Sequence, residues 1–456
     1  LDGVTGVQTC ALPISRHQRP AAGVESPGPS QIEMNSRLPL WPLLIDLRQQ
    51  FPPSKTLDLD RVAQEATAAV VQHLKPGARV AVAVGSRGIA NLQTIVRAAV
   101  RALEAAGARP FILPAMGSHG GGTSEGQVAL LADYGITESA VGVPIRPSME
   151  VQIVGSVIPG FDLCVSREAL SADGVLLINR IKPHTDFAGS IGSGLLKMLV
   201  VGLGKQAGAA QFHAAACRLG YEHVLRAHSR ALLETVRIIG GLAILEDQRH
   251  QTARIDAVRP SDIEAREPLL CDEASAMMPG LPFDDIDLLI VDRMGKNLSG
   301  TGMDPRVIGR SIHGYSLAEE TPRSGPRIRR LFVRDLTPES HGNAIGIGLA
   351  DFTTTRLVQA MDRGLTTVNS LTALSLQGAK IPLHFQTDRE VLEKAAATLG
   401  LANMQNARIV RILDTLHLEH LEVSVPLARE IEGRPGLETS GDPHPFEFDA
   451  AGNLAG

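Results

Sequence analysis

The feature that most constrains the fold is a regular alternation of short apolar runs and helical patterns between residues 79 and 245. The run Arg79–Val84 (RVAVAV) and the run 111–113 predict buried strands, and residues 91–106 between them have a helical spacing that stops at Gly107. Repeated strand–helix–strand units predict an α/β fold, with helices packed on a sheet. Further strands are expected near residues 151–154, 175–178 and 242–245, and further helices near residues 59–74, from 125 onward, 209–218 and 224–236. Ser124 and Gln127 have the spacing of a capping box for the helix from 125.

The length of 456 residues exceeds the roughly 150 residues of a typical domain about threefold, so more than one domain is expected. Prolines and charges become frequent and periodicity fades between residues 256 and 282, which indicates a domain boundary. We predict an N-terminal α/β domain over residues 34–275, a C-terminal α/β domain over 276–434 and a flexible tail over 435–456. In the second domain we expect strands near residues 286–291, 331–333 and 408–412, and helices near 354–361 and 388–399.

Residues 1–33 are predicted to be a non-native or disordered segment. They show neither a helical nor a strand period, and Gly3–Ile14 (GVTGVQTCALPI) looks like translated sequencing-adapter sequence. We expect the native start at Met34 and leave the preceding residues out of the fold prediction.

Composition excludes several classes of function. The net charge is −5 and aromatic residues make up 3% of the chain, which argues against a phosphate-binding or base-stacking surface for nucleic acid. No window approaches the 18 to 20 or so consecutive apolar residues that a membrane span needs. The four cysteines are far apart and form no CxxC pair, which fits a reducing compartment and disfavours a zinc ribbon. We therefore predict a cytoplasmic protein that binds neither nucleic acid nor membrane, with buried thiols.

The stretch Ile178–His213 is the most informative for chemistry. It leaves a predicted strand, passes through a glycine-rich loop, and holds Lys182, Lys197 and Lys205, three of only eight lysines in the chain. Loops after strands carry the reacting groups of many α/β proteins. A desolvated lysine amine is able to lose its proton and form covalent bonds, which a guanidinium does not do. The alternative for each lysine is a solvated or ion-paired side chain.

A second loop, AMGSHGGGTSEG, places Ser118 and His119 between a predicted strand and a helix N-terminus. Glycines there let backbone N–H groups approach an anion, and an imidazole serves as acid or base near neutral pH. The alternative is a histidine that is hydrogen-bonded within a tight turn. The HGGG run is also found in esterase oxyanion loops, but the chain has no G-x-S-x-G nucleophile elbow, which excludes a serine hydrolase.

Residues 202–207 match the dinucleotide-binding pattern G-x-G-x-x-A, after the apolar run 199–201. The acidic residue expected about 20 positions later would be Glu222, which falls in a helical stretch. Glycines that serve close packing are the alternative. In the second domain, the polar loop that contains Lys296 follows a predicted strand; it either closes over a ligand or is an ordinary exposed turn.

These motifs together resemble the nickel-dependent lactate racemase family. The resemblance covers residues 79–213 well and the C-terminal half loosely. The matching marks are Val84-Gly85-Ser86-Arg87, Gly117-Ser118-His119, Lys182-Pro183-His184, Phe187-Ala188-Gly189, Lys197, Gly202 and His213.

The resemblance implies a two-domain α/β enzyme with its active site in the cleft between the domains. Lys197 matches the lysine that tethers the nickel pincer nucleotide, pyridinium-3-thioamide-5-thiocarboxylate mononucleotide, and His213 matches the nickel ligand. Soft sulfur donors and an imidazole suit nickel(II). His119 and His184 match the two acid/base histidines, and Arg87 the clamp on the substrate carboxylate. Ser118, Gly202 and Gly204 are expected near the cofactor, and Lys296 is a further candidate for a contact with the substrate.

The function expected from the resemblance is racemisation or epimerisation of a 2-hydroxy acid, with cofactor-maturation enzymes as partners. Val84 replaces the acidic residue that the family usually has, and Thr185-Asp186 lengthen the segment after His184, so a hydroxy acid other than lactate fits equally well. Two alternatives remain open. One is an NAD(P)-dependent oxidoreductase that uses residues 202–207, and the other is a non-catalytic α/β ligand-binding protein.

Overall fold

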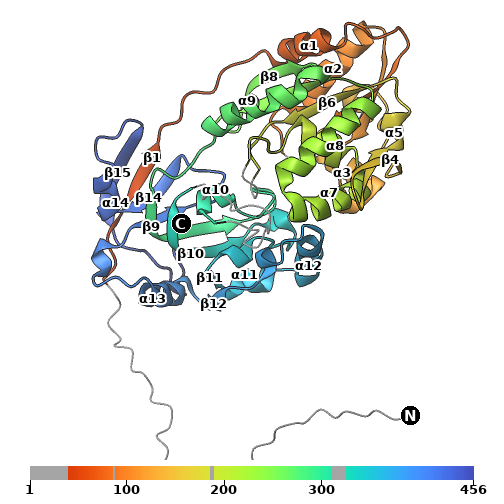
Figure 1. Cartoon of the computed structure of the whole chain (residues 1–456). Helices are drawn as coiled ribbons and strands as arrows, with labels where there is room; N and C mark the ends of the chain where they lie inside the picture. Colours follow the sequence, from red (N-terminus) through yellow and green to blue (C-terminus); the bar gives the residue numbers. More distant parts are fainter. Residues whose placement is uncertain (1–39, 86–87, 185–188, 311–324, 456) are drawn as a thin grey trace, which may run out of the picture. The chain divides into compact units, whose positions relative to one another are not determined.

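The computed structural model describes residues 40–85, 88–184, 189–310 and 325–455 (Figure 1). Its strands form a five-stranded sheet, an eight-stranded sheet and a two-stranded hairpin, with helices between them. The α/β fold class is therefore confirmed. Within these ranges, no helix has the length and apolar character that crossing a membrane requires.

The five-stranded sheet contains the predicted strand–helix–strand units. Its strand order is β3-β2-β6-β7-β8, and the first four strands are parallel, whereas β8 is antiparallel to β7. These strands are β2 (Arg79–Val84), β3 (Arg109–Pro114), β6 (Gly174–Arg180), β7 (Ile238–Glu246) and β8 (Thr252–Val258).

Both faces of this sheet are covered, which explains why its strands are almost continuously apolar. In β2, Val80 and Val82 enter one core with the helices α1 and α2, while Ala81 and Ala83 enter the other core with α7, α8 and α9. The helices of this part are α1 (Leu59–Val70), α2 (Leu92–Ala105), α3 (Ser124–Asp133), α4 (Glu138–Val141), α5 (Arg167–Leu170), α6 (Leu195–Lys197), α7 (Lys205–Leu219), α8 (Tyr221–Thr235) and α9 (Ile263–Ala276). The hairpin consists of β4 (Val151–Ile158) and β5 (Phe161–Ser166).

The eight-stranded sheet has the order β12-β11-β10-β9-β13-β14-β1-β15. The pairs from β12 to β13 are parallel, and β14, β1 and β15 continue the sheet in antiparallel fashion. Its strands are β1 (Leu44–Gln49), β9 (Asp285–Met294), β10 (Arg327–Leu336), β11 (Phe352–Thr354), β12 (Leu383–Phe385), β13 (Ile409–Ile412), β14 (His420–Ser424) and β15 (Leu437–His444). The helices between them are α10 (Pro305–Ile308), α11 (Thr355–Ala360), α12 (Arg363–Thr372), α13 (Asp388–Thr398) and α14 (Val425–Glu430).

The two ends of the described chain meet in this second sheet. Strand β1 pairs with both β14 and β15, although residues 44–49 were assigned to the N-terminal domain on sequence position. The structure also differs from the predicted flexible tail, because residues 437–444 form β15 and are held by the ladder to β1. Residues 1–33 lie outside the described ranges, and the boundary at 275/276 stays a prediction.

Two local predictions differ from the structure. Residues 263–276, which lie in the predicted boundary region, form helix α9. The cap of α3 is Thr123, whose side chain accepts the N–H of Gly126, so the predicted capping box at Ser124 is wrong. Residues 198–202 form a π-helical turn. From the sequence alone, a short apolar run of this kind is equally consistent with a buried strand. Of the thiols, those of Cys164 and Cys271 are buried and that of Cys217 is half-buried; Cys10 lies outside the described residues.

Candidate functional site

Three of the predicted site loops leave the same edge of the five-stranded sheet. The strands β3, β2 and β6 are adjacent and parallel, so their carboxyl ends lie side by side. His119 follows β3 and His184 follows β6, whereas Arg87, which follows β2, lies outside the described residues. The carboxyl edge of a parallel sheet is where α/β proteins place their ligand sites. The strand order therefore brings the loops of His119 and His184, which are far apart in the sequence, to one edge.

The clearest contact among the predicted site residues joins His184 and Lys197. The Nζ atom of Lys197 lies 3.0 Å from Nε2 of His184, and both side chains are half-buried. Lys197 is the last residue of the short helix α6, and the π-helical turn of residues 198–202 follows it directly. π-Helical turns are uncommon and frequently lie at functional sites. The amine and the imidazole are thus within hydrogen-bond reach of each other.

Tyr221 holds this pair from the first residue of α8. Its ring centroid lies 4.5 Å from that of His184, and the Nζ atom of Lys197 lies 5.7 Å from the tyrosine ring. The buried hydroxyl of Tyr221 donates to the carbonyl of Gly192 at 2.8 Å, which fixes the ring.

Aromatic contacts extend from Tyr221 to His213. Phe212 lies edge-on to Tyr221 with a centroid distance of 5.4 Å, and the ring of His213 lies 5.6 Å from that of Phe212. His213 is half-buried on α7. The predicted tether Lys197 and the predicted acid/base residue His184 therefore belong to one cluster with Tyr221 and Phe212, and the predicted nickel ligand His213 is the next residue of α7 after Phe212.

The loop after β3 packs against the π-helical turn and the start of α7. The N–H of Gly117 donates to the carbonyl of Gly202 at 3.4 Å. A Cβ atom on Gly122 would lie 2.8 Å from the side chain of Gln206, so the loop fits closely against α7. Ser118 and His119 are half-buried within this loop.

Gly202 and Gly204 serve close packing. A Cβ atom on Gly202 would lie 2.6 Å from the carbonyl oxygen of Ala115, and one on Gly204 would lie 2.5 Å from that of Val200. A dinucleotide fingerprint requires a strand before its glycines, whereas residues 198–202 are π-helical. The interpretation of residues 202–207 as a dinucleotide loop is therefore wrong. A role of the two glycines near another cofactor stays a prediction.

The acidic residue that the dinucleotide interpretation invoked has a structural role. Glu222 accepts hydrogen bonds from the backbone N–H of Ser190 at 2.7 Å, from the hydroxyl of Ser190 and from Arg226. Burial acts to raise the pKa of Glu222, but these hydrogen bonds together hold it below its usual value. Glu222 thus fixes the backbone at Ser190, near the loop of His184.

The loop after β9, which contains Lys296 and Asp304, contacts the segment of His184 through an ion pair. The Nζ atom of Lys182 lies 3.3 Å from the Oδ2 atom of Asp304, whose side chain is buried. Lys296 is half-buried and donates to the carbonyl of Gly300 at 2.7 Å, within its own loop. The loop of Lys296 therefore meets the first sheet at Lys182, while a substrate contact for Lys296 itself stays a prediction.

A buried carboxyl supports the helix that carries Lys197. Glu267 of α9 is 1% exposed and accepts the backbone N–H of Leu196 at 2.9 Å. Burial raises the pKa of Glu267 to about 7, against the opposing effect of hydrogen bonds from the backbone of Leu196 and Leu195. The sequence placed this residue in the predicted domain boundary and did not mark it as functional.

We expect the raised pKa of Glu267 to make stability depend on pH. Between pH 4.5 and 7 the folded state holds a proton on Glu267 that the unfolded state has lost, so the free energy of unfolding falls as pH rises through this range. A shift from 4.5 to about 7 corresponds to about 3 kcal/mol. Unfolding by urea at pH 4 and pH 8 measures this difference. Glu267→Gln removes the titrating group, so its free energy of unfolding should depend less on pH by that amount. The exposed control Glu125→Gln should match the wild type. An unchanged pH dependence in Glu267→Gln would contradict the assignment.

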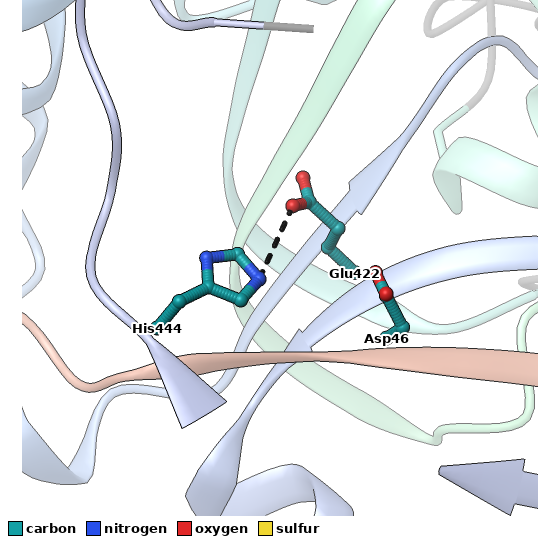
Figure 2. A group of neighbouring side chains, drawn as sticks. All are labelled: Asp46, Glu422 and His444. Carbon is teal, nitrogen blue, oxygen red and sulfur yellow. Dashed lines mark ion pairs between the residues drawn. The ribbon is translucent and has the colours of Figure 1, made fainter. Parts of the chain in front are cut away.

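A separate group of possible metal ligands lies on the second sheet. Asp46, Glu422 and His444 offer ligand atoms within 4.8 Å of one another, on the adjacent strands β1, β14 and β15 (Figure 2). Glu422 is paired with Arg411 at 2.8 Å, and Nε2 of His444 lies 3.7 Å from the other carboxylate oxygen of Glu422. These contacts account for Glu422 and His444 as members of ion pairs, and Asp46 is exposed beside them.

Sequence reasoning missed Tyr221 and Gln127 as well as Glu267. Tyr221 is one of only three tyrosines and directly follows Gly220, which was the one available signal. Gln127 was noted only for its spacing from Ser124. Its side chain in fact donates to the carbonyl oxygens of Gly117 and His119.

Comparison with known proteins gives no sequence match. No protein-family model matches the chain, and no curated protein matches it. Among solved structures, the lactate racemase apoprotein from Thermoanaerobacterium thermosaccharolyticum is similar over 81% of this chain and 98% of that one, with a TM-score of 0.47 and 13% identity. A protein from Thermotoga maritima is similar over 62% of this chain and 71% of that one, with a TM-score of 0.45 and 15% identity. At these values, the function of this chain has to be argued from its own residues.

Proposed function

We propose that this chain is a racemase or epimerase of a 2-hydroxy acid that works with a nickel pincer nucleotide tethered to Lys197. The single observation that carries the proposal is the contact of 3.0 Å between the Lys197 amine and the His184 imidazole. This contact brings Lys197, the candidate tether, next to His184, a candidate acid/base residue. The motif resemblance implies that these two residues belong to one active site.

The residues of the site fit such a cofactor. A primary amine would form the thioamide bond to such a cofactor, and an imidazole would be a suitable ligand for its nickel(II). Lys197 and His213 would supply these two groups; Lys197 lies near the ring of Tyr221, on which Phe212 packs, and His213 follows Phe212 on α7. The chemistry that the group supplies when bound is reversible acceptance of the α-hydrogen of the substrate as hydride.

The residues of the chain perform the remaining steps. His184 takes the proton of the substrate hydroxyl at Nε2 as the α-hydrogen leaves, so that a 2-keto acid forms, and the proton is returned when the α-hydrogen returns. Inversion requires a second base for the opposite enantiomer, and His119 on the loop after β3 is the candidate. A histidine is suited to both directions of proton transfer because its ordinary pKa is near neutral. Arg87 and Lys296 are the candidates that hold the substrate carboxylate.

The test is the intact mass and nickel content of the protein, produced together with cofactor-maturation enzymes. We expect a covalent addition of nucleotide size, about one nickel per chain as a single tethered site requires, and interconversion of the enantiomers of a 2-hydroxy acid. An unmodified mass without metal, in protein from a host that loads a known racemase, would overturn the proposal and favour a non-catalytic ligand-binding protein.

A further inference from the structure

A buried lysine connects two parts of the candidate site. Lys205 begins α7, the helix that carries His213, and its side chain is 0% exposed. Its Nζ atom donates to the carbonyl of Pro114 at 2.5 Å and to Oε1 of Gln127 at 3.4 Å. Both acceptors are uncharged, and they lie at the end of β3 and on α3, the two elements that flank the loop of His119.

The backbone at Lys205 is strained, which indicates that its side chain has a task. The φ angle of Lys205 is +54°, in the left-handed region that glycine adopts freely and that other residues adopt at a cost. Glycine would relieve this strain, but it would leave the carbonyl of Pro114 and Oε1 of Gln127 without their donor. Unusual backbone conformations that the surrounding structure holds in place cluster at functional sites.

Lys205 also decides which way the amide of Gln127 faces. The ammonium form of Lys205 has donors and no acceptor, so the oxygen of the buried Gln127 amide faces it. The Nε2 atom of Gln127 then faces the loop, where it donates to the carbonyl oxygens of Gly117 at 3.0 Å and His119 at 3.4 Å. The chain of hydrogen bonds thus runs from the first turn of α7 to the backbone of His119.

We propose that Lys205 is a positioning residue, which sets the backbone of His119 relative to α7 through Gln127. This inference rests on the proposed function, in which His119 is the second base and the helix α7 carries the nickel ligand His213. The position of His119 relative to α7 then matters for catalysis. Burial lowers the pKa of Lys205 to about 8. The uncharged amine retains two N–H donors, so the contacts do not depend on the charge.

The test measures the titration of His119 and the protection of its loop in the full-length protein without cofactor or substrate. Lys205→Met has a similar length but no donor, and the exposed Lys75→Met is its matched control. The NMR signal of the His119 ring gives its pKa, and hydrogen exchange gives the protection of the amides of residues 117–123. In Lys205→Met we expect the His119 titration to move and the amides to exchange at least tenfold faster, while the exposed His223 is unchanged.

A second variant keeps the inference falsifiable if Lys205→Met does not fold. Gln127→Leu breaks the same chain of hydrogen bonds and should move the His119 signal in the same way. The double variant should move it no further than either single variant, because both act through one path. A lower melting temperature with an unchanged His119 titration and unchanged exchange would overturn the inference. A failure of the proposed function is separate, because it would appear as the absence of a nucleotide adduct in the wild-type chain.

Discussion

Protein with arginine in place of Lys197 is expected to carry no covalent nucleotide under conditions in which the wild-type chain acquires one. Arginine keeps the positive charge and a similar length, so it is able to remain near His184 and Tyr221. A guanidinium does not form the thioamide bond that an amine forms. The expected effect is complete loss of the added mass, measured on the intact protein and on the peptide that contains residue 197.

Lys182→Arg is the matched control for this experiment. Lys182 lies on the same segment as His184, but it is paired with the carboxylate of Asp304, and arginine is able to make the same ion pair. This variant should acquire the nucleotide like the wild type. An adduct that persists in Lys197→Arg, or that moves to another peptide, would contradict the assignment of Lys197 as the tether.

The elements that were predicted correctly are those whose signals are local. The strand over residues 79–84 was recognised from its β-branched and alanine run, and the helix over 92–105 from its apolar spacing and the glycine that follows. The strand is buried on both faces, and the helix is buried along its apolar face. The α/β class followed from the alternation of such elements.

The pairing of strands that are far apart in the sequence could not be predicted from local patterns. Nothing local in residues 44–49 or 437–444 indicates that they pair with each other, because the partner of an edge strand is set by the assembled sheet. The π-helical turn of residues 198–202 was also concealed, since a buried helical turn and a buried strand are both short apolar runs.

The candidate site residues follow from sequence motifs, but their geometry does not. His184 and Lys197 were chosen from their motifs, whereas their contact depends on the loop between them and on the packing of α8, which places Tyr221. The adjacency of the loops after β3, β2 and β6 depends on the strand order, which single-sequence patterns do not contain. Glu267 comes from a third element, α9, and carries no motif.

His184→Ala is expected to lower turnover by about 10²–10⁴-fold, the usual loss when a positioned acid/base group is removed. Nickel content and covalent mass should stay at wild-type levels, because Lys197 and His213 are both retained. The comparison of turnover with cofactor content therefore separates a role in proton transfer from a role in cofactor attachment. The exposed His223→Ala, on α8, is the control and should keep wild-type turnover.

His184→Gln sharpens this test. Glutamine is able to hydrogen-bond to Lys197, so it preserves the polar contact, but its amide does not exchange a proton near neutral pH. Equal losses in His184→Ala and His184→Gln would assign the effect to proton transfer at Nε2. Recovery of turnover in His184→Gln would mean that the imidazole serves to orient Lys197, and the two-base assignment would then fall. Because the contact between His184 and Lys197 is what carries the proposed function, this pair of variants decides whether His184 transfers a proton or only orients Lys197.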